Sequence, residues 1–191
     1  MPDAFSSSQA RKQSVRLKRF QIASVTYAFG LFFLALCHGV GLFPTLSLWV
    51  VGLAFLAINV AFYTVFRRGL NLGFKDPSLT EWQVYTGGLM VAVILVLGEH
   101  IHFLAIPFYS SLFVFAMLQL KPMQLVRLEV FVLLTYGAAL ATRQYLFATQ
   151  TDLRIELIYA AVVALSSGWY ALAASYISSL RARLRGSVQA L

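Results

Sequence analysis

The sequence predicts an all-α protein, a polytopic bundle of six transmembrane helices with both ends of the chain in the cytoplasm. Of its 191 residues, 60% are hydrophobic and only 12% are charged, whereas a soluble domain has about 25% charged residues. The apolar residues form long uncharged runs, each close to the roughly 20 residues with which a helix spans a bilayer. The runs lack the alternation of membrane-spanning strands. Basic residues cluster beside these runs, as they do next to transmembrane helices.

Six apolar runs follow one another along the chain. The first ends at a turn that contains Gly41 and Pro44, and the second ends at Arg67 and Arg68. The predicted spans cover about residues 20–40, 46–66, 79–97, 103–120, 123–141 and 155–177.

Local signals place the later helix ends. Ser78 and Glu81 have the spacing of a capping box, which predicts that the third helix begins near Leu79. The fourth helix accommodates Pro107 in its first turns, where a proline costs least. A second capping box at residues 149–152 precedes the sixth helix. The chain is therefore divided into a basic cytoplasmic segment (1–19), a six-helix membrane domain (20–177) and a cytoplasmic linker helix (178–191).

The distribution of positive charge predicts the orientation. With the N-terminus inside, thirteen of the 15 lysines and arginines lie on the cytoplasmic side, and only Arg143 and Arg154 lie outside. This placement predicts a multi-pass protein of a bacterial inner membrane. It also accounts for the net charge of +8 through contacts with the lipid bilayer, so that we expect no nucleic-acid partner.

One group of residues has the chemistry of a metal or ligand site. His38, Glu99, His100 and His102 all map to the outer side of the predicted bundle. Imidazoles and a carboxylate together can bind a transition metal or respond to pH. The alternative is that they are ordinary polar residues of short turns. The sequence does not identify a cofactor, and it contains no motif of a catalytic site, so we expect no enzymatic activity from this chain.

Two further pairs of ionisable residues lie near predicted helix ends. Arg127 and Glu129 begin the fifth helix, and Arg154 and Glu156 begin the sixth. We interpret both pairs as interfacial anchors, because long charged side chains at helix ends reach the headgroup region.

Small residues predict close helix packing in two places. Ala160, Ala164 and Gly168 recur every four residues in the sixth helix, a spacing that lets transmembrane helices approach each other. Gly87 and Gly88 in the third helix favour the same interpretation.

Two stretches of the sequence resemble a known family. They are NLGFKDPSLT at residues 71–80, and RIEL at residues 154–157 together with Trp169 and YISSLRARLR at residues 176–185. Over about residues 17–185 the chain resembles the N-terminal membrane region of bacterial GGDEF-type diguanylate cyclases. That resemblance implies a sensory and anchoring module, whose signal controls a cytoplasmic GGDEF domain that condenses two GTP molecules into cyclic di-GMP. The sequence stops before any GGDEF motif, so no catalytic residue is carried over.

The end of the sixth helix independently predicts a signal-transfer linker. Ile177, Leu180, Leu184 and Leu191 follow the spacing of a coiled-coil seam, and no proline or glycine lies between residues 171 and 185. We therefore expect a homodimer through this helix and its linker. Alternatives are an input module for a histidine kinase or another nucleotide cyclase, or a small membrane enzyme or carrier that uses the outer histidines.

Overall fold

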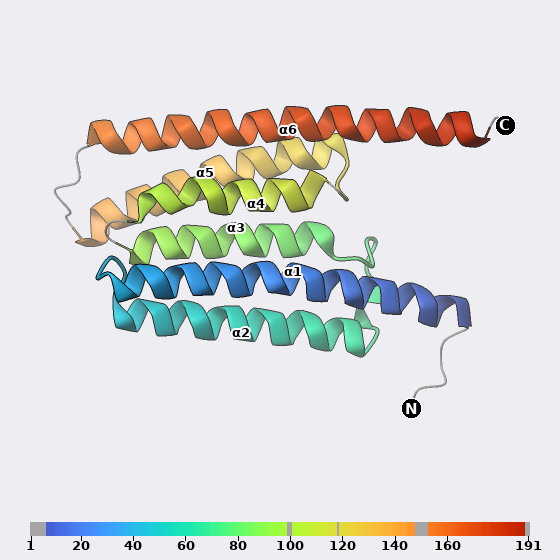
Figure 1. Ribbon diagram of the computed structural model, residues 1–191, viewed down its shortest axis with the longest axis horizontal. Helices are drawn as coiled ribbons and strands as arrows, with labels where there is room; N and C mark the ends of the chain where they lie inside the picture. The colour runs from blue at the N-terminus through green and yellow to red at the C-terminus, as the bar shows by residue number, and fades with distance from the viewer. Residues whose placement is uncertain (1–6, 99–100, 118, 148–152, 190–191) are drawn as a thin grey trace.

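The computed structural model describes residues 7–98, 101–117, 119–147 and 153–189, and within these ranges every regular element is a helix (Figure 1). Six α-helices follow the order of the six predicted runs, with short 3-10 turns before α3 and α4. Their bounds are α1 Ser7–Gly39, α2 Thr45–Arg67, η1 Leu70–Gly73, α3 Thr80–Leu97, η2 His102–Leu104, α4 Ala105–Met117, α5 Pro122–Phe147 and α6 Leu153–Gln189. The predicted all-α fold class is confirmed.

Five of these helices are long and apolar enough to cross a bilayer, namely α1, α2, α3, α5 and α6. The sixth, α4, forms with η2 an apolar segment at His102–Met117, which at 1.5 Å per residue is about 24 Å long. It is therefore shorter than the hydrocarbon core of about 30 Å. Many large apolar side chains on the outer helices are exposed, as contact with lipid requires. The chain is a multi-pass membrane protein.

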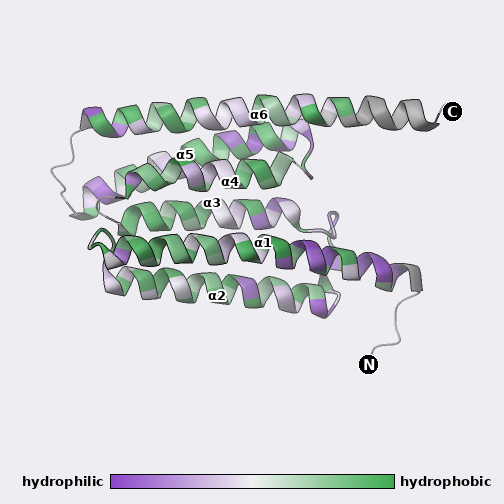
Figure 2. Ribbon diagram, in the orientation of Figure 1, coloured by the Kyte–Doolittle hydropathy of each residue, from purple (hydrophilic) through white to green (hydrophobic). Residues whose placement is uncertain are grey.

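The helices lie side by side, and the start of α1 and the end of α6 lie at the same end of the bundle (Figure 1). We call this the terminal end and the opposite one the distal end. The terminal end holds the first turns of α1 and α5, the last turns of α2 and α6, and the α2–α3 and α4–α5 connections. Together these segments carry thirteen of the 15 basic residues. Figure 2 shows the hydrophilic start of α1 followed by its apolar remainder.

Two helices are longer than predicted. The basic segment before the first span belongs to α1, which is helical from Ser7, because no proline or glycine separates it from the apolar run. Likewise α5 continues to Phe147, six residues beyond the predicted end of the fifth span. Hydropathy marks where a helix leaves the apolar layer and not where the helix ends.

The predicted capping box at Ser78 is wrong. The residue that precedes α3 is Leu79, which has φ 51° and no side-chain cap. Asp76 caps the helix instead, since its carboxylate accepts hydrogen bonds from the backbone N–H groups of Ser78 (2.9 Å) and Thr80 (3.2 Å). Aspartate favours such local turns because its side chain reaches the backbone two residues on.

The core lies around α4, whose inner face is fully buried at Tyr109, Phe113 and Ala116. This helix packs between α3 on one side and α5 and α6 on the other. Gly87 and Gly88 allow the close approach, because an added Cβ would lie 2.7 Å from the Leu112 side chain at Gly87 and 2.8 Å from the Phe131 ring at Gly88. The packing interpretation of the two glycines is confirmed.

Candidate functional site

At the distal end, two ionisable side chains from different helices meet inside the protein. Nδ1 of His102, in η2, lies 3.0 Å from Oε2 of Glu156, in the first turn of α6. Both residues are buried, with 5% and 8% of their surface exposed. Because an ionisable group at membrane depth is costly without a partner, this contact joins the start of α6 to the start of α4.

Arg143, on α5, adds a positive charge to the same region. It is 5% exposed, and its Nη1 donates a hydrogen bond of 2.7 Å to the carbonyl oxygen of Gly98. Gly98 ends α3, where the last carbonyl groups have no partner within the helix. The charge of Arg143 also acts on the carboxylate of Glu156. His102, Arg143 and Glu156, which we call the distal polar cluster, thus connect α3, α4, α5 and α6.

The turn between α3 and α4 explains why His102 points inward. Ile101 and Leu104 on either side of it are almost completely buried, which anchors the short η2 turn in the core. An added Cβ at Gly98 would lie 2.3 Å from the Ile101 side chain, so a residue with a side chain does not fit there. Uptake of a proton from the surroundings, or its release, by the imidazole or the carboxylate would change the net charge of this buried cluster.

The two histidines that the structure describes have different partners. His38, half-buried at the end of α1, donates from Nδ1 to the carbonyl oxygen of Phe43 at 2.8 Å and closes the α1–α2 turn, whereas His102 contacts Glu156. Glu99 and His100 lie outside the described residues. Among those described, no three histidine, cysteine or acidic side chains form a group that could hold a metal. Metal binding by the four predicted residues stays a prediction.

The exposure of the two arginines agrees with the anchoring interpretation, whereas the two glutamates contact other helices. Arg127 is largely exposed, and Arg154 is exposed as well. Glu156 is buried in the distal polar cluster, and Glu129 accepts a hydrogen bond of 2.8 Å from Ser167 on α6. The glutamates were misassigned because proximity to a helix end does not show which side of the helix faces its neighbours.

The small residues of α6 pack inside the bundle. Ala160, Ala164 and Gly168 are half-buried on the same helix face as Val163 and Ser167, which are buried. That face covers α4 and α5, in keeping with the predicted helix packing. It follows that the small-residue face is occupied within one chain, and a dimer through α6 would have to use another face.

The linker residues lie on a continuous helix. Helix α6 runs for 37 residues from Leu153 to Gln189 without interruption, through the predicted seam positions Ile177, Leu180 and Leu184. Ile177 is half-buried and Leu180 is exposed. The absence of a break between the membrane-spanning part and the linker is confirmed.

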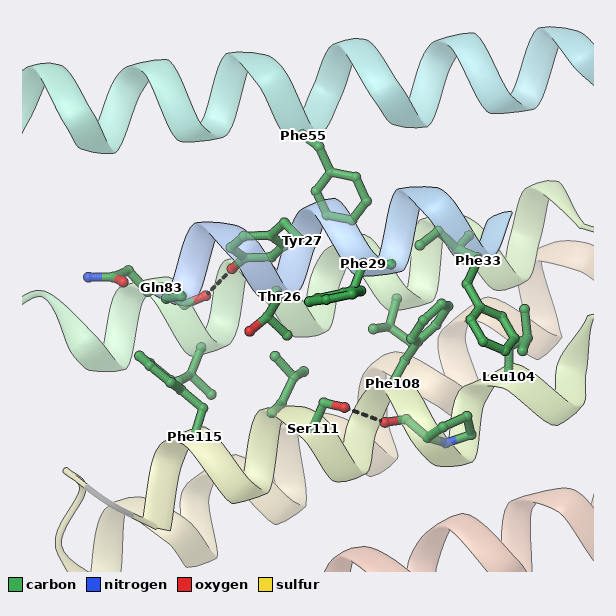
Figure 3. Close-up of a pocket in the computed structure, with 18 residues that line it drawn as sticks. Thr26, Tyr27, Phe29, Phe33, Phe55, Gln83, Leu104, Phe108, Ser111 and Phe115 are labelled. Carbon is green, nitrogen blue, oxygen red and sulfur yellow. Dashed lines mark hydrogen bonds between the residues drawn. The ribbon is translucent and has the colours of Figure 1, made fainter. Parts of the chain in front are cut away.

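A second candidate site is an apolar pocket of about 270 Å³ between α1, α3 and α4 (Figure 3). Phenylalanine side chains from α1 and α4 face each other across it, and Phe29 and Phe33 on its α1 wall are 68% and 50% exposed. Thr26, Gln83 and Ser111 are the main polar residues of the lining. The sequence analysis missed this pocket, because hydropathy does not distinguish a helix face that lines a cavity from one that faces lipid.

No family model, curated protein or solved structure matches this chain. The sequence analysis also missed Arg143 as a site residue, although an arginine beside an apolar run is itself a signal that the side chain points inward.

Proposed function

We propose that this chain is the membrane input module of a bacterial signalling protein, and that helix α6 carries its signal to an output domain. The observation behind the proposal is the length of α6. Its 37 residues extend over about 55 Å, of which Arg154–Ile177 is the membrane-spanning part. One rigid helix therefore begins in the distal polar cluster and ends beyond the opposite end of the bundle.

The distal polar cluster is the part of the bundle best suited to receive a signal. Glu156 lies in the first turn of α6, and its contact with His102 joins that turn to η2, at the start of α4. A ligand or proton that changes these contacts favours another position of α6. Because the helix has no break before Gln189, a rotation or axial shift at Glu156 reaches its far end.

The output domain is assigned by the resemblance of residues 17–185 to the membrane region of GGDEF-type diguanylate cyclases. In this assignment the termini are cytoplasmic, in keeping with the basic residues at the terminal end, and two copies meet so that their GGDEF domains can condense GTP. The chain itself supplies no catalytic group. It anchors the output domain in the inner membrane and sets the relative rotation of the two copies.

The test is a series of insertions in a fusion of residues 1–191 to a GGDEF diguanylate cyclase domain. One to seven residues of alanine are inserted after Arg185, and cyclic di-GMP is measured in membranes with equal amounts of fusion protein. At about 100° per residue, an insertion of two residues rotates the output domain by roughly 200°. An insertion of seven residues returns it to within about 20° of its starting orientation. We expect low output with two residues and nearly restored output with seven.

A matched series inserted after Gln9, at the other terminus, controls for effects on membrane insertion and should leave the output unchanged. Output that does not depend on the length of the insertion after Arg185 would refute the proposal of a rigid helical linker.

A further inference from the structure

The apolar pocket continues towards the terminal end as a basic recess on the same three helices. The recess, of about 10 Å³, shares Gln83 and Phe115 with the pocket and adds Arg16 and Arg19. Its other lining residues are Phe20, Ser78, Thr80 and Gln119. The recess is too small to enclose a phosphate group, so an anion would lie on its rim between the arginines.

Helical spacing makes the recess and the pocket one groove. On α1 the lining residues recur every three or four positions and so lie on one helix face. They are at positions 16, 19, 23, 26, 30 and 33. The same holds for positions 80, 83, 87, 91 and 94 of α3 and for positions 108, 111 and 115 of α4. Gln119, which follows α4, also lines the recess. The groove is basic at the terminal end and apolar from Ala23 onwards.

The charges along the groove are complementary to those of an anionic phospholipid. No acidic residue lines it, and neither Arg16 nor Arg19 forms an ion pair with a carboxylate of the described residues. Arg16 is half-buried, and among the described residues its guanidinium donates to Gln13 alone, at 3.3 Å. Asp76, the acidic residue of the α2–α3 connection, accepts hydrogen bonds from the backbone that begins α3.

The depth of each part in the membrane also agrees with a lipid. The sequence of α1 changes from basic to apolar between Arg19 and Phe20, which places the arginines at the level of the headgroups. The pocket volume of about 270 Å³ equals roughly nine water volumes of about 30 Å³, enough for much of one acyl chain. The exposed rings of Phe29 and Phe33 leave the pocket open towards the bilayer.

We propose that this groove binds one anionic phospholipid from the leaflet at the terminal end, with its phosphate between Arg16 and Arg19 and one acyl chain in the pocket between α1, α3 and α4. The acyl chain moves from the apolar bilayer into an apolar pocket and contributes no preference between lipids. The preference for an anionic lipid over a neutral one therefore comes from the two arginines. The proposal stands independently of the signalling role, since it needs no output domain.

The experiment uses the purified chain in detergent and measures the binding of the first lipid by native mass spectrometry. Dioleoyl phosphatidylglycerol and dioleoyl phosphatidylcholine are titrated separately. We expect phosphatidylglycerol to bind at least about tenfold more tightly, as two arginines at the membrane surface would give. The double variant R16Q/R19Q should lose this preference. Its matched control, R67Q/R68Q, removes two charges from the same end but none from the groove, and should keep the preference within about twofold.

A second pair of variants tests the acyl-chain pocket. Thr26→Trp fills the pocket and should weaken the binding of phosphatidylglycerol, whereas Val25→Trp, on an adjacent position outside the pocket, should not. Circular dichroism and size-exclusion chromatography verify that all four variants remain folded. Excess inorganic phosphate should not displace the lipid. Equal losses in R16Q/R19Q and R67Q/R68Q, unchanged binding in T26W, or displacement by phosphate alone would each overturn the proposal.

Discussion

Replacing Arg143 by methionine removes the guanidinium of the distal polar cluster while keeping a long, flexible side chain. The variant leaves the carbonyl oxygen of Gly98 without its hydrogen bond of 2.7 Å, and a bond from a charged donor contributes about 1.5–3 kcal/mol. It also leaves Glu156, 8% exposed, without the positive charge of the guanidinium. We expect the free energy of unfolding to fall by about 2–3 kcal/mol.

The assay is equilibrium unfolding in mixed micelles of a mild detergent and sodium dodecyl sulfate, followed by the loss of helical circular dichroism. Arg154→Met is the matched control, because Arg154 is at the same end but is exposed. Surface substitutions change stability by no more than about 0.5 kcal/mol. In a double-mutant cycle with Glu156→Leu, the double variant should lose about 1 kcal/mol less than the sum of the single losses, since residues in one network are not additive. Equal stability of the R143M and R154M variants would refute the role given to Arg143.

Three further predictions concern packing and orientation. Gly88→Ala should destabilise the bundle by about 1–2 kcal/mol through overpacking, since the new Cβ would lie 2.8 Å from an aromatic ring on α5. The control Gly52→Ala, whose new Cβ would have nothing within 4 Å, should not destabilise it. Ser167→Ala should lower the free energy of unfolding by about 1 kcal/mol in the same assay, because Ser167 donates a hydrogen bond to Glu129 on α5. The control Ser166→Ala should be neutral, because Ser166 donates to a carbonyl oxygen of α6 itself. Reporter fusions test the orientation, and a cytoplasmic signal near the α3–α4 turn would contradict it. We expect cytoplasmic signals after Arg68, Lys121 and Arg185, and periplasmic signals near Phe43, His100 and Gln150.

The sequence predicts the helices of this protein better than their contacts. Uncharged runs of about 20 residues can only be membrane-spanning helices, so the second and third spans agree with α2 and α3 to within a residue or so. Helix α4 is shorter than its run because the first residues of that run form the η2 turn and its helix ends at Met117.

The candidate site follows from the sequence only in part. His102 was among the predicted site residues, but its partner Glu156 is 54 positions away in the chain, and only tertiary packing brings them together. In a membrane protein, the faces that contact lipid and those that contact other helices are both apolar, so hydrophobic periodicity does not reveal which face points inward. An ionisable residue within a membrane helix does indicate the inward face, because its side chain avoids lipid. Applied to Arg143, this rule would have identified the distal polar cluster.

The most direct test of the signalling account combines a change at the distal end with a break in α6. In the fusion to a GGDEF domain, Glu156→Gln should change the cyclic di-GMP output of the membranes by about threefold or more, as a shift of roughly 0.7 kcal/mol between two positions of the helix would give. Inserting four glycines after Arg185 should remove the difference between the E156Q variant and the unsubstituted protein, because the flexible joint no longer transmits movement of α6. A difference that persists across the glycines, or no difference with the helix intact, would contradict the account.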